Sequence, residues 1–237
     1  MAAKLKSISK QIHWSSVLKA LVFALAWIWF PFWFFAILAL GLYFIPFFQA
    51  RRLAIPFLTL LILCYIQTPD MAFAIIFGVV FYETLLIKDL LLIDRRSAYE
   101  LLVLALTFLL LREFYMKFNE GITGAALIYS FFTAGVFALL VRSFVRAFSA
   151  DAVISKAVRR VAGLLFFLLF WQVLIAGLFL PIDFIYQSVV AFLVAVLLVD
   201  LAPEYLFGTF CRTKILTAST VVFALFVIVL GSARWGL

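Results

Sequence analysis

The sequence predicts an all-α fold, a polytopic bundle of transmembrane helices, and two observations carry that prediction. First, apolar residues make up 68% of the chain and charged residues 13%, against roughly 45–50% and about 25% in soluble domains. Second, the apolar residues form long runs separated by short charged turns. In lipid, backbone polar groups are satisfied only within helices or closed barrels, and these runs lack the alternation of barrel strands. Helices are therefore expected, with the 30 phenylalanines as lipid-facing bulk.

Residues 1–19 predict an amphipathic helix on the cytoplasmic surface of the membrane. They carry four lysines and the only histidine of the chain: Lys4, Lys6, Lys10, Lys19 and His13. A basic amphipathic helix lies on an anionic leaflet with its apolar side buried. The apolar run that follows is longer than the core of a signal peptide, which has 7–15 residues, so an uncleaved anchor is expected.

Residues 20–50 contain no charged residue and predict a helical hairpin. As one helix they would be about 46 Å long at 1.5 Å per residue, whereas the hydrocarbon core is about 30 Å thick. Pro31 removes a backbone hydrogen bond and disfavours helix just before it, so a bend is expected there. One strongly tilted helix over the same residues is the alternative.

About seven further membrane helices are predicted, each an apolar run that ends at a charged or proline-containing turn. The runs are 53–68, 71–87, 97–111, 122–141, 161–180, 184–199 and 215–231. The runs 53–68 and 97–111 are shorter than the usual 17–25 residues. These two are expected to extend into flanking polar residues, to lie in thinner bilayer or to pack inside the bundle. Residues 20–237 are thus predicted to form a single transmembrane helical domain.

The positions of the basic residues predict the orientation of the chain. If residues 20–50 cross the membrane twice, all lysines and arginines except Arg112, Lys117 and Arg234 fall on one side. A single crossing divides them more evenly. Because basic residues accumulate in cytoplasmic loops, the N-terminus is expected in the cytoplasm and the C-terminus outside.

Glu83 and Gln172 are the polar residues within predicted membrane helices that deserve a functional hypothesis. A charged residue at mid-span costs roughly 2.5–3.5 kcal/mol on insertion and is a functional candidate by default. For Glu83 the alternatives are an interfacial position, paired with Lys88 or an arginine of the next turn, and a hydrogen bond between helices. Gln172 either bonds across helices or lines a polar path.

A basic stretch at residues 142–160 is the longest predicted cytoplasmic segment. Its basic residues are Arg142, Arg146, Lys156, Arg159 and Arg160. Clusters of this kind bind anionic lipid, and the segment is also the best docking site for a soluble partner.

The residues that catalysis and metal binding usually require are scarce. The chain has one histidine, and Cys64 and Cys211 share no metal-ligand or redox spacing. No metal site or other cofactor is therefore expected, and neither His-Glu-x-x-His nor Gly-x-Ser-x-Gly occurs. The net charge of +8 is interpreted as topology-determining loop charge, so a nucleic-acid partner is not expected.

Three function classes remain. The first is a non-enzymatic subunit or scaffold that binds membrane lipids and other membrane proteins, or copies of itself. The second is a small transporter or channel whose polar path is built from Glu83 and Gln172 with Ser130, Thr133 and Gly135. The third is a lipid-modifying enzyme that uses the interfacial carboxylates Asp89, Asp94 and Glu100. The sequence favours a function without catalysis.

Overall fold

The computed structural model describes residues 14–45, 53–89, 95–118, 123–148, 156–207, 212–233 and 235. Within these ranges the chain forms nine α-helices and no strand, apart from one isolated bridge between Ile182 and Trp235. The helices are α2 (Trp14–Trp29), α3 (Phe32–Phe44), α4 (Ala54–Ile66), α5 (Met71–Lys88), α6 (Arg95–Lys117), α7 (Gly124–Phe148), α8 (Lys156–Leu178), α9 (Phe184–Phe207) and α10 (Arg212–Ser232). The predicted all-α class is confirmed.

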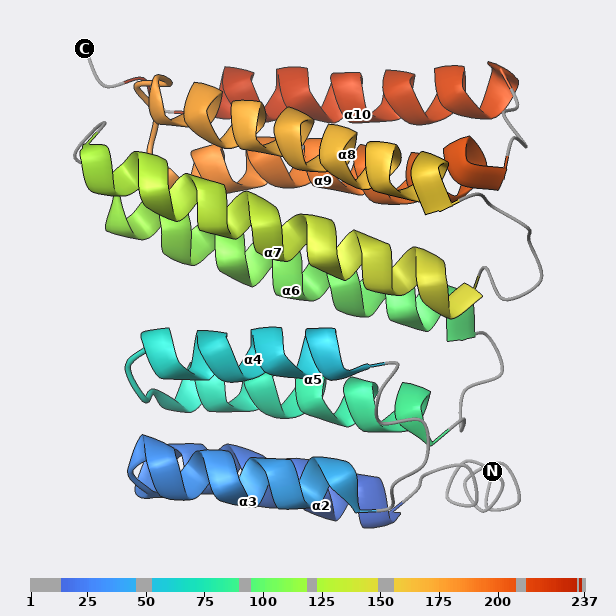
Figure 1. The fold of residues 1–237 in the computed structure, drawn as a ribbon. Coiled ribbons are helices and arrows are strands. Elements are labelled where there is room, and N and C mark those ends of the chain that lie inside the picture. The colour runs from blue at the N-terminus through green and yellow to red at the C-terminus, as the bar shows by residue number, and fades with distance from the viewer. Residues whose placement is uncertain are drawn as a thin grey trace, which may run out of the picture. The chain divides into compact units, whose positions relative to one another are not determined.

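The chain divides into two compact units, Met1–Leu102 and Val103–Leu237. In the first unit α2 packs along α3 and α5, and α5 packs along α4. In the second unit α7 packs along α8 and α9, α8 along α9, and α9 along α10. Helices that follow one another in each unit run antiparallel (Figure 1). The single membrane domain expected for residues 20–237 stays a prediction.

The break predicted near Pro31 separates α2 from α3. Pro31 itself has extended backbone angles, φ −56° and ψ 146°, and its carbonyl accepts the first hydrogen bond of α3 from the Phe35 amide. Residues 20–45 therefore form two antiparallel helices (Figure 1) and not one tilted helix. Helix α2 already begins at Trp14, while residues 1–13 of the predicted amphipathic helix lie outside the described residues.

Within the described residues, five helices are long and apolar enough to cross a membrane, so the larger predicted number of spans is not confirmed. They are Met71–Lys88, Gly124–Ala147, Arg160–Leu178, Phe184–Ala202 and Arg212–Ser232. Helices α3 and α4 have 13 residues each, or about 20 Å at 1.5 Å per residue. Pro31 follows the end of α2 and Pro69 the end of α4, and proline cannot continue a helix. Helix α6 extends into flanking polar residues, which is one of the three alternatives expected for its short apolar run. Its charged residues distinguish it from the five helices named above.

Aromatic side chains form the interior of the first unit. Phe23 of α2 stacks on Phe81 of α5 with ring centroids 4.2 Å apart, and Tyr43 of α3 stacks on Phe57 of α4 at 4.0 Å. All four side chains are fully or almost fully buried. The interpretation of the phenylalanines as lipid-facing bulk is therefore wrong for these positions, because the rings supply the large contact area that joins the helices.

The Tyr115 side chain of α6 reaches α8 in the second unit. The buried Tyr115 hydroxyl donates a hydrogen bond of 3.1 Å to the Leu174 carbonyl. Gly177 lies one turn further along α8, where the absence of a side chain leaves space for the Tyr115 ring. Glycine at this position thus allows a large polar aromatic residue to enter between two helices.

Candidate functional site

Glu83 lies on the outward side of α5, five residues before the helix ends. Its side chain is half-buried, and Val79, one turn earlier on the same face, is 59% exposed. No other residue in the described ranges forms a hydrogen bond or ion pair with Glu83. The predicted pairing with Lys88 is wrong, because the Lys88 ammonium turns to Tyr43 and Asp89 instead.

Lys88 belongs to a buried cluster at the C-terminal end of α3. Its ammonium donates a hydrogen bond of 2.6 Å to the Tyr43 carbonyl and lies 3.4 Å from the Asp89 carboxylate. Lys19 of α2 donates to the carbonyl of Ile45, the C-cap residue of α3. Carbonyls at a helix C-terminus lack partners within the helix and carry the negative end of its dipole. Two lysines from different helices therefore cap α3.

This capping cluster is a structural feature that the sequence did not identify. Lys88 has no exposed side-chain surface, so its ammonium is unavailable to a lipid headgroup or a soluble ligand. Its position in a charged turn resembled that of an ordinary interfacial residue. The one sequence signal for this cluster is that α3 has no basic residue in its last turn, so the carbonyls at its end need a cation from elsewhere in the chain.

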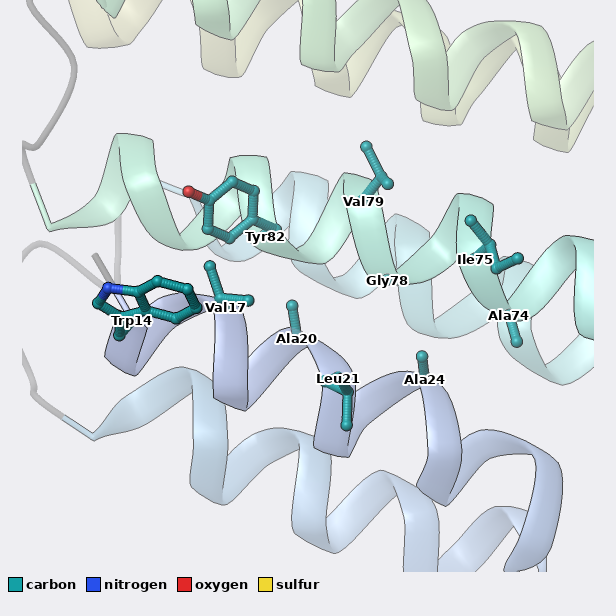
Figure 2. Close-up of a pocket in the computed structure, with 10 residues that line it drawn as sticks. All are labelled: Trp14, Val17, Ala20, Leu21, Ala24, Ala74, Ile75, Gly78, Val79 and Tyr82. Atoms are coloured by element: carbon teal, nitrogen blue, oxygen red, sulfur yellow. The ribbon is translucent and has the colours of Figure 1, made fainter. Parts of the chain in front are cut away.

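An apolar groove of about 490 Å³ lies between α2 and α5 (Figure 2). Its lining residues are Trp14, Val17, Ala20, Leu21, Ala24, Ala74, Ile75, Gly78, Val79 and Tyr82. Small residues form its floor, since a Cβ atom added at Gly78 would lie 3.2 Å from the Ala24 Cβ. Small residues at a crossing allow membrane helices to approach closely. The Tyr82 hydroxyl and the Trp14 indole nitrogen lie at the same end of the groove (Figure 2).

Gln172 lies on the exposed side of α8, six residues before the helix ends. Leu168 and Leu169, one turn earlier, are 37% and 48% exposed. The amide of Gln172 has no hydrogen-bond partner within the described residues. Gln172 belongs to the second unit and Glu83 to the first, so a polar path that uses both stays a prediction.

The hydroxyl groups of the membrane helices are largely occupied by backbone carbonyls. Buried Thr84 and Thr107 donate to the carbonyl four residues earlier, at 2.8 and 2.7 Å. Ser130 donates to the Leu127 carbonyl and accepts from the Trp171 indole at 3.0 Å. Such bonds satisfy the hydroxyl inside its own helix. Ser130 thus joins α7 to α8, a structural role that the predicted polar path did not include.

The basic residues of stretch 142–160 lie at the end of α7 and the beginning of α8. Arg142, Arg146 and Arg160 have exposed side chains. Lys156 and Arg159 lie in the first turn of α8, but their side chains and residues 149–155 lie outside the described part. The exposed arginines are available to anionic groups at this end of the second unit.

The carboxylates considered for catalysis do not form a described cluster. Asp89 pairs with Lys88, Glu100 is half-buried on α6, and Asp94 lies outside the described residues. Among the residues that the structure describes, no group of three histidine, cysteine, aspartate or glutamate side chains is placed to hold a metal ion.

These observations define a class: the described part of the chain is all-helical and has five helices suited to a bilayer, which indicates a membrane protein. Comparison with known proteins does not assign the chain to a more particular class. The chain matches no known protein family, no curated protein and no solved structure.

Proposed function

We propose that the protein is a multi-pass integral membrane protein that acts as a non-enzymatic subunit or scaffold. In this role it binds membrane lipid together with other membrane proteins or further copies of itself. The observation that carries the proposal is Gln172, an exposed amide well inside a membrane helix and without a partner among the described residues. The positions of the basic residues support an N-terminus in the cytoplasm and a C-terminus outside.

An unpaired amide in contact with lipid is unfavourable, because lipid tails offer no hydrogen bonds. Glutamine side chains in membrane helices commonly bond across to another helix. Because Gln172 is on the exposed side of α8, we infer that this other helix belongs to a second chain. Helix α10 supports the same role, since none of its residues is buried and it presents its apolar surface to the surroundings.

The test is the mass and composition of the particle after gentle extraction in native lipid, for the wild type and for Gln172→Leu. A wild-type particle with a defined partner or a fixed number of copies is expected. One such hydrogen bond contributes about 0.6–1.7 kcal/mol, so Gln172→Leu should weaken the assembly roughly 3- to 20-fold.

Thr217→Val is the matched control. It also removes a polar group from an exposed helix position, but the Thr217 hydroxyl is already bonded to the Thr213 carbonyl. This variant should assemble like the wild type. A lone wild-type monomer that carries only lipid, or an unchanged assembly of Gln172→Leu, would contradict the proposal.

A small transporter or channel is the second candidate function, and Glu83 favours it. A half-buried carboxylate that has no ion-pair partner among the described residues is suited to bind a proton or cation in transit. Flux across proteoliposomes should then be abolished in Glu83→Gln at unchanged expression. Flux equal to that of the wild type would exclude this role for Glu83.

A further inference from the structure

The groove between α2 and α5 has the shape and chemistry of a lipid-chain site. Its volume of about 490 Å³ lies within the 300–1,000 Å³ of ordinary ligand sites, which are mostly apolar with a few placed polar groups. The groove is open along its length, because Leu21, Ile75 and Val79 on its two walls are 52%, 63% and 59% exposed. An elongated apolar chain can therefore enter it sideways from the bilayer.

The two polar atoms of the groove are hydrogen-bond donors without partners in the described chain. The Trp14 side chain is 66% exposed and that of Tyr82 half-buried. By contrast, the indoles of Trp27 and Trp171 both donate within the protein, to Cys64 and Ser130. This indole N–H and this phenol O–H point toward the same end of the groove (Figure 2).

We propose that this groove binds one acyl chain of a glycerophospholipid, with the ester carbonyl of that chain at the Trp14 and Tyr82 donors. Tryptophan and tyrosine commonly occupy the membrane interface, where one end of the ring is apolar and the other polar. An ester carbonyl lies at that same depth of a bilayer and accepts hydrogen bonds. This inference deepens the proposed function and rests on its premise that the chain is embedded in lipid.

Selectivity comes from the donors more than from the apolar walls. Lipid tails are as apolar as the groove, so moving a chain between bilayer and protein changes the hydrophobic free energy little. A hydrogen bond at the groove end distinguishes lipids that have a carbonyl there from lipids that do not. The walls determine whether a chain fits at all.

The first test uses the full-length protein in bilayers that contain equal amounts of diester and diether phosphatidylglycerol with the same chain length. The lipid that remains bound after gentle extraction is quantified by native mass spectrometry. One neutral hydrogen bond predicts a preference for the ester lipid of about 2- to 12-fold. The double variant Tyr82→Phe with Trp14→Phe should bring the ester-to-ether ratio of bound lipid to one. Tyr65→Phe, at an exposed tyrosine outside the groove, should leave this ratio unchanged.

The second test fills the groove. Leu21→Trp adds bulk at an exposed lining position, while Leu18→Trp adds the same bulk at a 64% exposed position of α2 outside the groove. Leu21→Trp should retain one phospholipid fewer than the wild type, and Leu18→Trp should retain as many. Both substitutions point away from the buried core, so the fold should survive them.

The outcomes separate this inference from the proposed function. An ester-to-ether ratio of one in the wild type, or full lipid retention by Leu21→Trp, would overturn the lipid site and leave the Gln172 assembly test untouched. Loss of assembly in Leu21→Trp with lipid retention intact would make the groove a protein contact and would also overturn it. Loss of the ester lipid with assembly unchanged would establish the lipid site.

Discussion

Gly177→Ala should strongly destabilise the second unit, because the new methyl group would enter the space of the Tyr115 ring. A Cβ atom at residue 177 would overlap the Tyr115 hydroxyl oxygen and would lie 2.8 Å from Cζ and 3.0 Å from Cε1. The ring is fully buried, so it cannot rotate away without displacing its neighbours. The phenol must also leave the Leu174 carbonyl if the ring moves.

The expected loss of stability in Gly177→Ala has two contributions. Overpacking a filled interior costs typically 1–3 kcal/mol, and a buried hydroxyl that loses its partner costs about 1–3 kcal/mol. The higher helix propensity of alanine returns at most about 1 kcal/mol. A net loss of about 2–4 kcal/mol is expected, which lowers the melting temperature of a chain of this size by about 5–15 °C.

Helix α8 supplies its own control. A Cβ atom added at Gly163 would meet nothing within 4 Å, so Gly163→Ala should be neutral or stabilising. The assay is thermal unfolding of the detergent-solubilised protein, followed by circular dichroism. In a Tyr115→Phe background, which removes the closest atom, Gly177→Ala should cost less, with a coupling energy of about 1 kcal/mol or more. Equal melting temperatures for Gly177→Ala and Gly163→Ala would refute the reasoning.

Two lysine substitutions should show how burial determines the strength of an ion pair. Lys88→Met should lower the free energy of unfolding by about 1.5–3 kcal/mol, because the Tyr43 carbonyl loses a charged hydrogen-bond donor and the Asp89 carboxylate loses an ion-pair partner. Lys214→Met should lower the free energy of unfolding by less than about 1 kcal/mol. The Lys214 nitrogen also lies 3.4 Å from a carboxylate oxygen, that of Asp200, but these two side chains are 47% and 31% exposed. Thermal unfolding followed by circular dichroism measures both variants. Similar losses of stability in the two variants would contradict the conclusion that burial makes the Lys88 interactions stronger.

The order and approximate limits of the helices could be predicted from the sequence, because local chemistry determines where helices end. Pro31 ends one helix and begins the next, and the Asp70 side chain caps α5 by accepting from the Ala72 amide at 3.1 Å. Such signals lie within a few residues of the boundary they set. They do not report whether a helix is long enough to cross the bilayer once its ends are fixed.

The inward side of each helix could not be predicted, because the apolar runs carry too little polar contrast to mark it. Phe23 and Phe81 are buried while Phe34 is 69% exposed, and nothing local distinguishes them. Contacts between distant residues were equally hidden. Gly177 was visible only as an interruption of an apolar run, since the ring that requires it comes from Tyr115 on another helix.

Of the candidate site, the sequence located the individual residues but not their surroundings. Glu83 and Gln172 were selected because polar groups are rare in apolar helices, and both are unpartnered in the described chain. The groove was not foreseen. Its floor of alanine and glycine has no composition that distinguishes it from other apolar helix surfaces, and it exists only because α2 and α5 pair.

The two lysines that cap α3 impose an order on the biosynthesis of the first unit. Lys19 precedes its acceptor, Ile45, by 26 residues, so it is already present when α3 leaves the ribosome. Lys88 follows its acceptor, Tyr43, by 45 residues, and chains emerge N-terminus first. Until α5 is complete, the end of α3 has only one of its two cations. A nascent chain that stops after α4 therefore lacks the buried Lys88 donor at the end of α3.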